Sequence, residues 1–204
     1  MLHLDELNER FRHQSPQEII AFALSNAKRP ILTTNFGPYA VTLVHAMHTQ
    51  QKDIPVIWVK TGFNTKATLS HAQELIQKYD IDIKTYQSVI FPHHLTKLLG
   101  GIPKINTKQH SVFTEIIKLA PFRKALGDHQ PDVWFTNLRK GKTAYRESID
   151  IFSYNQEGIL KVCPFYYFDE VDLEVYMNTH QLATEFDYYD PTKVLEHREC
   201  GIHL

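Results

Sequence analysis

The chain has 204 residues, an ordinary share of apolar and charged residues and a net charge of −1, so no basic field is available to hold nucleic acid. Its first residues are charged from the fifth position, and no apolar run approaches the roughly 20 residues that span a bilayer. We expect no membrane anchor and no nucleic-acid partner. Two cysteines make neither a disulfide framework nor a zinc or iron–sulfur motif, which favours a reducing, cytoplasmic location.

Helix and strand patterns alternate through the first half of the chain. Residues 15–28 predict a helix with Ser15 as cap and Glu18 completing a capping box. The pattern then predicts a strand over 30–35, a helix over 36–51 and a continuous apolar strand over 54–59. A helix capped by Asn64 is expected over 64–80, followed by a third strand over 81–87.

The second half continues this alternation with longer gaps. A helical pattern covers 113–126, a fourth strand 131–139, a fifth strand 158–168 and a late helix 169–180. Strands separated by crossover helices are typical of parallel sheets. The sequence therefore predicts an α/β fold, a three-layer sandwich with a central, mostly parallel sheet and a C-terminal tail. We expect one domain over residues 1–204.

Three segments follow strands of the predicted sheet, where open parallel sheets bind ligands. Residues 33–38 (TTNFGP) carry two hydroxyls, an amide and a glycine before a helix N-terminus, a combination that suits an anion. Residues 60–64 (KTGFN) are similar, and for both segments an ordinary turn is the alternative. Residues 137–146 concentrate basic side chains suited to phosphate or sulfate, or form a solvated loop: Arg139, Lys140, Lys142 and Arg146.

The two cysteines differ in their surroundings. Cys163 lies in an apolar strand, so we expect a buried core thiol. Cys200 lies four residues before the end of the sequence, among Arg198, His197 and His203, and basic neighbours lower the pKa of a thiol. It is either a nucleophile on a tail or an incidental exposed thiol.

These segments together resemble the phosphoadenylyl-sulfate (PAPS) reductase family of the PP-loop nucleotide-binding superfamily (adenine nucleotide alpha hydrolase-like fold). RECGIH at 198–203 resembles the family's E-C-G-L-H signature, and TTNFG at 33–37 its S-S-S-F-G loop. PVIWVKTGFN at 55–64 is similar to the element ending in D-T-G-Y, IKLAPFRKAL at 117–126 to K-V-E-P-M-x-R-A-L, and WFTNLRK at 134–140 to W-F-x-G-L-R-R. The chain departs from this pattern at Lys60, Ala120 and Asn137, and by a shorter segment before residue 198.

The resemblance implies reduction of PAPS to sulfite and adenosine 3',5'-bisphosphate, with Cys200 as the nucleophile that becomes an S-sulfocysteine. Thioredoxin or glutaredoxin would be the external reductant, no cofactor would be bound, and the protein would be a homodimer. Two cysteines cannot hold the iron–sulfur cluster of the adenylyl-sulfate (APS) branch. By resemblance the substrate would be bound by Thr33, Thr34, Asn35, Phe36, Gly37, Thr61, Gly62, Lys118, Arg139, Lys140, Arg146, Arg198 and His203.

The resemblance also divides the chain into N-terminal helices (1–28), a nucleotide-binding core (29–165) and a C-terminal helix with a catalytic tail (166–204). Because such a tail must open and close, we expect residues from about Tyr188 onward to be poorly held without ligand. Two other functions stay open. One is a binding protein for a nucleotide or sulfonucleotide without turnover. The other is a different PP-loop enzyme that uses ATP, although the S-G-G-x-D-S loop of those enzymes is missing.

Overall fold

A six-stranded sheet forms the centre of the computed structural model, which describes residues 3–141, 143–193 and 202. Five strands pair in parallel, and the sixth runs antiparallel at one edge. The prediction of an α/β fold around a mostly parallel sheet is confirmed. In spatial order the strands are β3 (Ile83–Gln87), β2 (Val56–Lys60), β1 (Pro30–Thr33), β4 (Val133–Phe135), β6 (Leu160–Val162) and β5 (Phe152–Tyr154).

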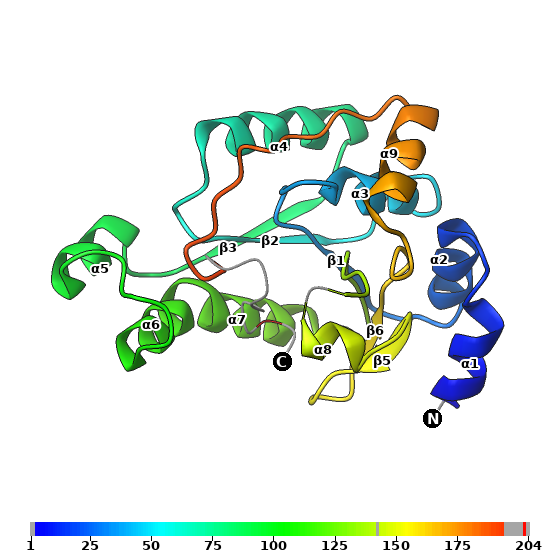
Figure 1. Cartoon of the computed structure of the whole chain (residues 1–204), viewed down its shortest axis with the longest axis horizontal. Coiled ribbons are helices and arrows are strands. Elements are labelled where there is room, and N and C mark those ends of the chain that lie inside the picture. The colour runs from blue at the N-terminus through cyan, green and yellow to red at the C-terminus, as the bar shows by residue number, and fades with distance from the viewer. Residues whose placement is uncertain (1–2, 142, 194–201, 203–204) are drawn as a thin grey trace.

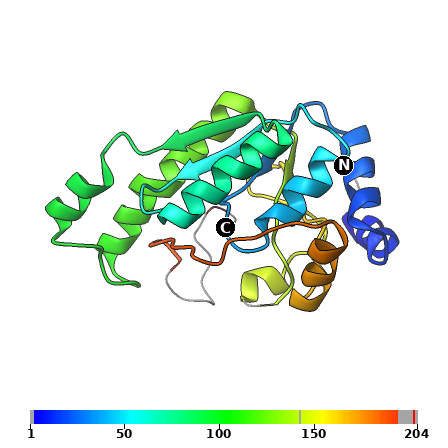
Figure 2. The ribbon, with the colours of Figure 1, turned by 90° about the horizontal axis from the view of Figure 1, so that it is seen from above.

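Helices cover both faces of the sheet (Figures 1 and 2). One face carries α3 (Ala40–His48) and α4 (Lys66–Tyr79), with α2 (Pro16–Ser25) and α9 (Glu170–Thr179) packed against α3. The other face carries α7 (Ala120–His129), which contacts β2 and β3. The remaining helical elements are α1 (Leu4–Phe11), α5 (Pro92–Leu99), α6 (Lys108–Thr114), the π-helical stretch η1 (Glu115–Leu119) and α8 (Ala144–Glu147).

Local structure follows the expected elements with several differences, and the fifth strand, expected over 158–168, covers only Leu160–Val162 as β6. The capping box of Ser15 and Glu18 at α2 is present as predicted. At α4 the cap is Thr65, whose hydroxyl accepts the N–H of Thr68 at 3.0 Å, so the prediction of Asn64 as cap is wrong by one residue. The helical pattern over 113–126 is divided by η1, and the edge strand β5 and the helix α5 had no clear signal in the sequence.

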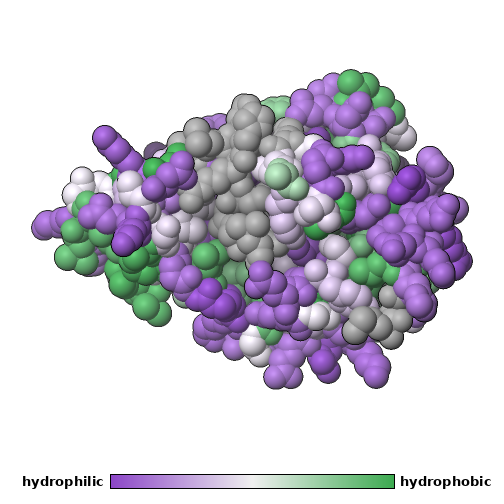
Figure 3. Space-filling model, turned by 60° about the horizontal axis from the view of Figure 1, so that its bottom comes forward, coloured by the Kyte–Doolittle hydropathy of each residue, from purple (hydrophilic) through white to green (hydrophobic). Residues whose placement is uncertain are grey.

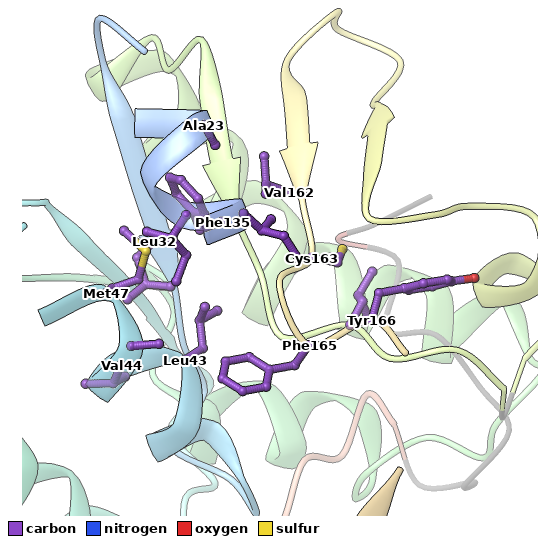
Figure 4. Close-up of a cluster of buried hydrophobic side chains, with 14 of the residues drawn as sticks. Ala23, Leu32, Leu43, Val44, Met47, Phe135, Val162, Cys163, Phe165 and Tyr166 are labelled. Carbon is purple, nitrogen blue, oxygen red and sulfur yellow. The ribbon is translucent and has the colours of Figure 1, made fainter. Parts of the chain in front are cut away.

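Two apolar layers lie on opposite faces of the sheet because successive strand residues point to opposite sides. Leu32 and Phe135 belong to the larger layer, while Ile31 and Trp134 belong to the layer under α7. Figure 4 shows Cys163 among the larger group, beyond the end of β6. Cys163 is fully buried, and burial raises the pKa of its thiol to about 12. The prediction of a buried core thiol is confirmed.

Apolar side chains are exposed at the end of the molecule formed by α5 and α6 (Figure 3). Within the described ranges, no helix is both long and apolar enough to cross a bilayer. The exposed apolar residues in and around these two helices are Val89, Phe91, Leu98, Ile102 and Val112.

Candidate functional site

The strand order creates a crevice beside β1. The chain leaves β1 toward β2 on one side and later returns to place β4 on the other, so the carboxyl end of β1 is a topological switch point, where open α/β sheets bind ligands. A cavity of about 200 Å³ lies there. Its lining brings together residues predicted separately from four segments: Thr33, Thr34, Asn35, Thr61, Lys118, Arg139 and Arg146.

The loop after β1 is closed by its own side chains. The Thr34 hydroxyl accepts the N–H of Phe36 at 3.1 Å, and the side-chain Oδ1 of Asn35 accepts the N–H of Gly37 at 2.9 Å. Such local bonds are typical of threonine and asparagine in turns. The structure therefore differs from the open cradle of amides expected from the sequence, because side-chain oxygens occupy the places where anion oxygens would accept. The Phe36 ring is fully buried against Trp58, and Phe36 does not line the cavity.

Trp134 holds the first hydroxyl of the site. Its indole Nε1–H donates to Thr33 Oγ1 at 2.8 Å, from the neighbouring strand β4. The indole is fully buried and packs against Phe122, with ring centroids 5.1 Å apart. Trp134 lies in the segment that resembles the family element W-F-x-G-L-R-R, and no role in the site was predicted for it from the sequence. The signal that could have found it is the alternation along β4, which puts Trp134 on the same face as Thr33.

Two arginines from the segment after β4 line the cavity. Arg146 is 7% exposed, and the Arg139 guanidinium carbon lies 5.3 Å from the centroid of the Tyr39 ring. Burial lowers the pKa of Arg139. The charge of Glu170 raises this pKa, and the charge of Arg146 lowers it. A guanidinium nevertheless stays protonated at neutral pH. Lys140, predicted as a third cation of this group, is exposed, and its ammonium lies 5.6 Å from the centroid of the Tyr167 ring. It does not line the cavity.

Lys118 forms a buried ion pair with Asp190, and its Nζ also lies 3.3 Å from Thr192 Oγ1. Burial raises the pKa of Asp190, but the Lys118 charge, together with hydrogen bonds from Lys118 and Thr192, outweighs burial and holds that pKa below its ordinary value. Lys118, which the resemblance predicts to bind the substrate, lines the cavity with a carboxylate of the chain already beside it.

Asp190 belongs to a C-terminal segment, residues 184–192, that lies across the site. The Thr184 hydroxyl accepts the N–H of Tyr39, and the Asp187 carbonyl accepts the Thr65 and Thr68 hydroxyls at 2.6 and 2.8 Å. Asn35 Nδ2 donates to the Tyr188 hydroxyl at 3.0 Å. The expectation that the chain is poorly held from Tyr188 is therefore wrong for residues 188–193. Sequence reasoning missed Tyr188 and Asp190 as parts of the site.

Gly62 and Lys60 shape the second segment without lining the cavity. Gly62 has a φ of 81°, and a Cβ at this position would lie 2.2 Å from Pro92 Cγ. Only glycine fits this turn between β2 and α4. The Lys60 ammonium lies 4.7 Å from the centroid of the Trp58 ring, a cation–π contact that places the charge over the indole.

Three predicted residues, Arg198, Cys200 and His203, lie outside the described residues. Ile202 is described: it lines the cavity and packs against the apolar layer that contains Ile57. Among the residues with described positions, no three histidine, cysteine, aspartate or glutamate side chains are grouped to hold a metal ion.

Comparison with known proteins identifies the family. The model of the phosphoadenosine phosphosulfate reductase domain matches residues 29–186. Phosphoadenosine 5'-phosphosulfate reductases of Synechococcus sp. and Proteus mirabilis are 27% and 28% identical, covering 88% and 89% of this chain and 78% and 74% of their own lengths.

Solved structures agree on the fold. The phosphoadenylyl-sulfate (PAPS) reductase of Candida auris, in a phosphate complex, is 18% identical with a TM-score of 0.76, covering 89% of this chain and 87% of its own. The NH3-dependent NAD synthetase of Campylobacter jejuni is 12% identical with a TM-score of 0.57, covering 91% and 77%. With a family model matched over most of its length, the chain belongs to the phosphoadenosine phosphosulfate reductase family.

Proposed function

We propose that the chain reduces 3'-phosphoadenylyl sulfate to sulfite and adenosine 3',5'-bisphosphate, in assimilation of sulfate. The observation that most supports this proposal is the cavity at the switch point, which brings the hydroxyls of Thr33 and Thr34 together with the cations Arg139 and Arg146. The chain also belongs to the family of these reductases. Hydroxyl donors and guanidinium groups suit a phosphosulfate, because charge-assisted hydrogen bonds to its oxygens are stronger than neutral ones.

The proposed first step is nucleophilic. The Cys200 thiolate attacks the sulfonyl sulfur, a new S–S bond forms, and the S–O bond to the phosphate breaks with its electron pair leaving on the nucleotide. The position of Ile202 supports this role, since it lines the cavity and two residues of chain span at most about 7 Å. Charge on the leaving phosphate would be stabilised by Arg139 and Arg146, with Arg198 and His203 assisting near the thiol.

The proposed second step needs an external dithiol protein, thioredoxin or glutaredoxin. One of its thiolates attacks Cys200 Sγ and displaces sulfite, which leaves a mixed disulfide. Its second thiol then resolves that disulfide and returns Cys200 as a thiol. The two electrons come from the dithiol, and no bound cofactor takes part. We also propose a homodimer acting in the cytoplasm. The exposed apolar side chains at α5 and α6 support an association surface.

Two cysteine variants test the proposal. With PAPS and no reductant, the wild-type protein should gain a sulfonate adduct on Cys200, measured by intact mass with peptide mapping. Cys200→Ser should gain none and make no sulfite, while still binding adenosine 3',5'-bisphosphate. Cys163→Ser is the matched control, because that thiol is buried in the core and its replacement should cost stability without abolishing sulfite formation.

A wild-type protein that binds the nucleotide tightly but forms neither adduct nor sulfite would contradict the reductase proposal and favour the binding protein. The Lys118–Asp190 ion pair would support that alternative, because a carboxylate of the chain already neutralises one cation of the site.

A further inference from the structure

Three of the described residues that line the cavity each carry a buried polar atom without a hydrogen-bond partner. Buried polar groups are nearly always hydrogen-bonded, because an unpaired one keeps its full desolvation cost. Among the described residues, four buried side-chain N or O atoms have no hydrogen-bond partner. One is Ser153 Oγ, in β5, away from the cavity. The other three belong to residues that line the cavity: Trp58 Nε1, Asn64 Oδ1 and Asn137 Oδ1.

The orientation of the Asn137 amide is fixed by the protein. Its Nδ2 donates to the Tyr39 carbonyl oxygen at 3.0 Å, so turning the amide would bring two acceptor oxygens together. Oδ1 is therefore left as an unpaired acceptor. Asn137 stands where the family element W-F-x-G-L-R-R has a glycine, so this amide is a feature of the present chain.

The orientation of the Trp58 indole is also fixed, in this case by packing. Trp58 is 4% exposed, its ring meets the edge of Phe36 with centroids 4.8 Å apart, and the Lys60 ammonium lies over it. An indole N–H can only donate. Asn64 contributes the third atom, because Thr65 caps α4 in its place and leaves the Asn64 side chain without a capping role.

A ligand that pairs with all three atoms must carry both hydrogen-bond donors and hydrogen-bond acceptors. Trp58 Nε1 needs an acceptor, but the oxygens of Asn64 and Asn137 need N–H or O–H donors. Ionised phosphate and sulfate oxygens only accept, so the phosphosulfate cannot satisfy the two amides. The adenine edge and the ribose hydroxyls carry donors as well as acceptors. Trp58 and Asn137 belong to segments on opposite sides of β1, about 10 Å apart at ordinary strand spacing, which is the scale of a nucleoside.

We propose that Trp58, Asn64 and Asn137 form a subsite that recognises the neutral nucleoside part of the substrate and determines base and ribose specificity. This inference rests on the proposed function. The arginines and the Thr33–Thr34 hydroxyls bind the anionic part, and the three unpaired atoms favour ligands that supply them with hydrogen-bond partners.

Calorimetric titration of Trp58→Phe tests the subsite, because phenylalanine keeps an aromatic ring against Phe36 and removes the N–H. Asn137→Gly, which restores the family residue, is the second variant. Each should bind adenosine 3',5'-bisphosphate roughly 3- to 30-fold more weakly and inorganic pyrophosphate as tightly as wild type. Ser153→Ala is the matched control, since it removes an unpaired buried atom outside the cavity and should leave both affinities unchanged.

Stability gives an independent readout. Removing an unpaired buried N–H relieves its desolvation cost and offsets the packing lost with the smaller ring, so Trp58→Phe should leave the melting temperature of the ligand-free protein near that of wild type while weakening nucleotide binding. A purely structural tryptophan would lower both. Because Asn137→Gly also loses the bond to Tyr39, Trp58→Phe decides the result if that variant folds poorly.

Three outcomes overturn the inference. Nucleotide affinity unchanged in Trp58→Phe would show that a trapped water, or nothing, pairs with the indole. An equal loss of pyrophosphate affinity would place the effect on the anion site. Wild-type protein that binds pyrophosphate but no adenosine bisphosphate would refute the subsite directly. By contrast, nucleotide binding with the expected variant losses but no sulfite formation would refute only the reductase proposal.

Discussion

Lys118 and Asp190 are 72 residues apart in the chain and form a buried ion pair beside the cavity, with side chains only 8% and 4% exposed. One partner comes from η1 and the other from the C-terminal segment, so the pair fixes that segment across the site. A ligand phosphate that approaches Lys118 meets an ammonium already shared with a carboxylate and with the Thr192 hydroxyl.

The pair can be measured with a double-mutant cycle. Asp190→Asn leaves the Lys118 charge buried without its carboxylate, and such changes typically cost about 3–5 kcal/mol of unfolding free energy. Lys118→Met should also destabilise the protein. The double variant should lose less than the sum of the two single losses, because each single change leaves one charge uncompensated. Urea unfolding gives all four values, and strict additivity would contradict a coupled pair.

Acid should remove this contribution at a defined pH. The pKa of Asp190 is lowered by folding, so its stabilisation is fully present above the unfolded value, about 3.9, and is lost as pH falls through the lower folded value. The unfolding free-energy difference between wild type and Asp190→Asn should therefore be constant near pH 7 and shrink below about pH 4. A difference that first shrinks between pH 7 and pH 5 would point to another group.

Trp134→Phe tests whether the indole positions the Thr33 hydroxyl. Loss of one neutral hydrogen bond should lower kcat/KM for PAPS roughly 2- to 10-fold. The melting temperature should fall modestly, because phenylalanine retains packing against Phe122 but leaves part of the buried indole volume unfilled. Thr33→Val should have a similar effect that does not add to that of Trp134→Phe, and Thr33→Ser should restore most of the activity. Additive losses would mean that the two residues act separately.

Arg139→Ala and Lys140→Ala compare neighbouring cations, of which only Arg139 lines the cavity. Arg139→Ala should weaken adenosine 3',5'-bisphosphate binding at least tenfold, since a charge-assisted hydrogen bond contributes about 1.5–3 kcal/mol. It should also reduce the salt dependence of binding, which Lys140→Ala should hardly change. Titrations at low and high salt give both quantities. Equal losses in the two variants would support the sequence prediction that Lys140 binds the substrate.

Gly62→Ala and Gly158→Ala separate steric contact from backbone strain. Both glycines have φ near 80°, but a Cβ meets Pro92 only at Gly62, while Gly158 has open space. Each change should cost about 1–2 kcal/mol for the left-handed conformation. Gly62→Ala should cost more, because the β2–α4 turn or α5 must shift. Equal unfolding free energies for the two variants would show that α5 moves aside freely.

The parts of the fold that could be predicted from the sequence carry strong local signals. The capping box of α2 and the apolar run of β2 each depend on neighbouring residues, and both form as expected. The predicted cap of α4, Asn64, was wrong by one residue, because asparagine and threonine are both favourable at the N-cap and Thr65 follows directly. The edge strand β5 has three residues, too few for a pattern to be distinct.

Residues that line the cavity could be predicted from the sequence where a segment follows a strand, but not where long-range contacts bring a residue to the cavity. Thr33, Thr34 and Arg139 follow strands, and the topology brings them together. Nothing local to Asp190 indicates that it lies beside Lys118, and nothing in the strand pattern shows that the nitrogen of Trp58 is unpaired. The hydrogen-bond and ion-pair partners of these side chains depend on which distant parts of the chain fold against them, not on the periodicity of one element.

The strand order also bears on folding during synthesis. On one side β1 can pair with β2 soon after both leave the ribosome, but its other edge lacks a partner until β4 is made, with Pro30 paired to Val133. Distant pairings of this kind slow folding and leave an apolar strand edge exposed in the meantime. The cavity needs still more of the chain, since Tyr188 and Asp190 line it. A nascent chain that has not reached these residues has an incomplete site, so ligand binding should report that synthesis has passed Asp190.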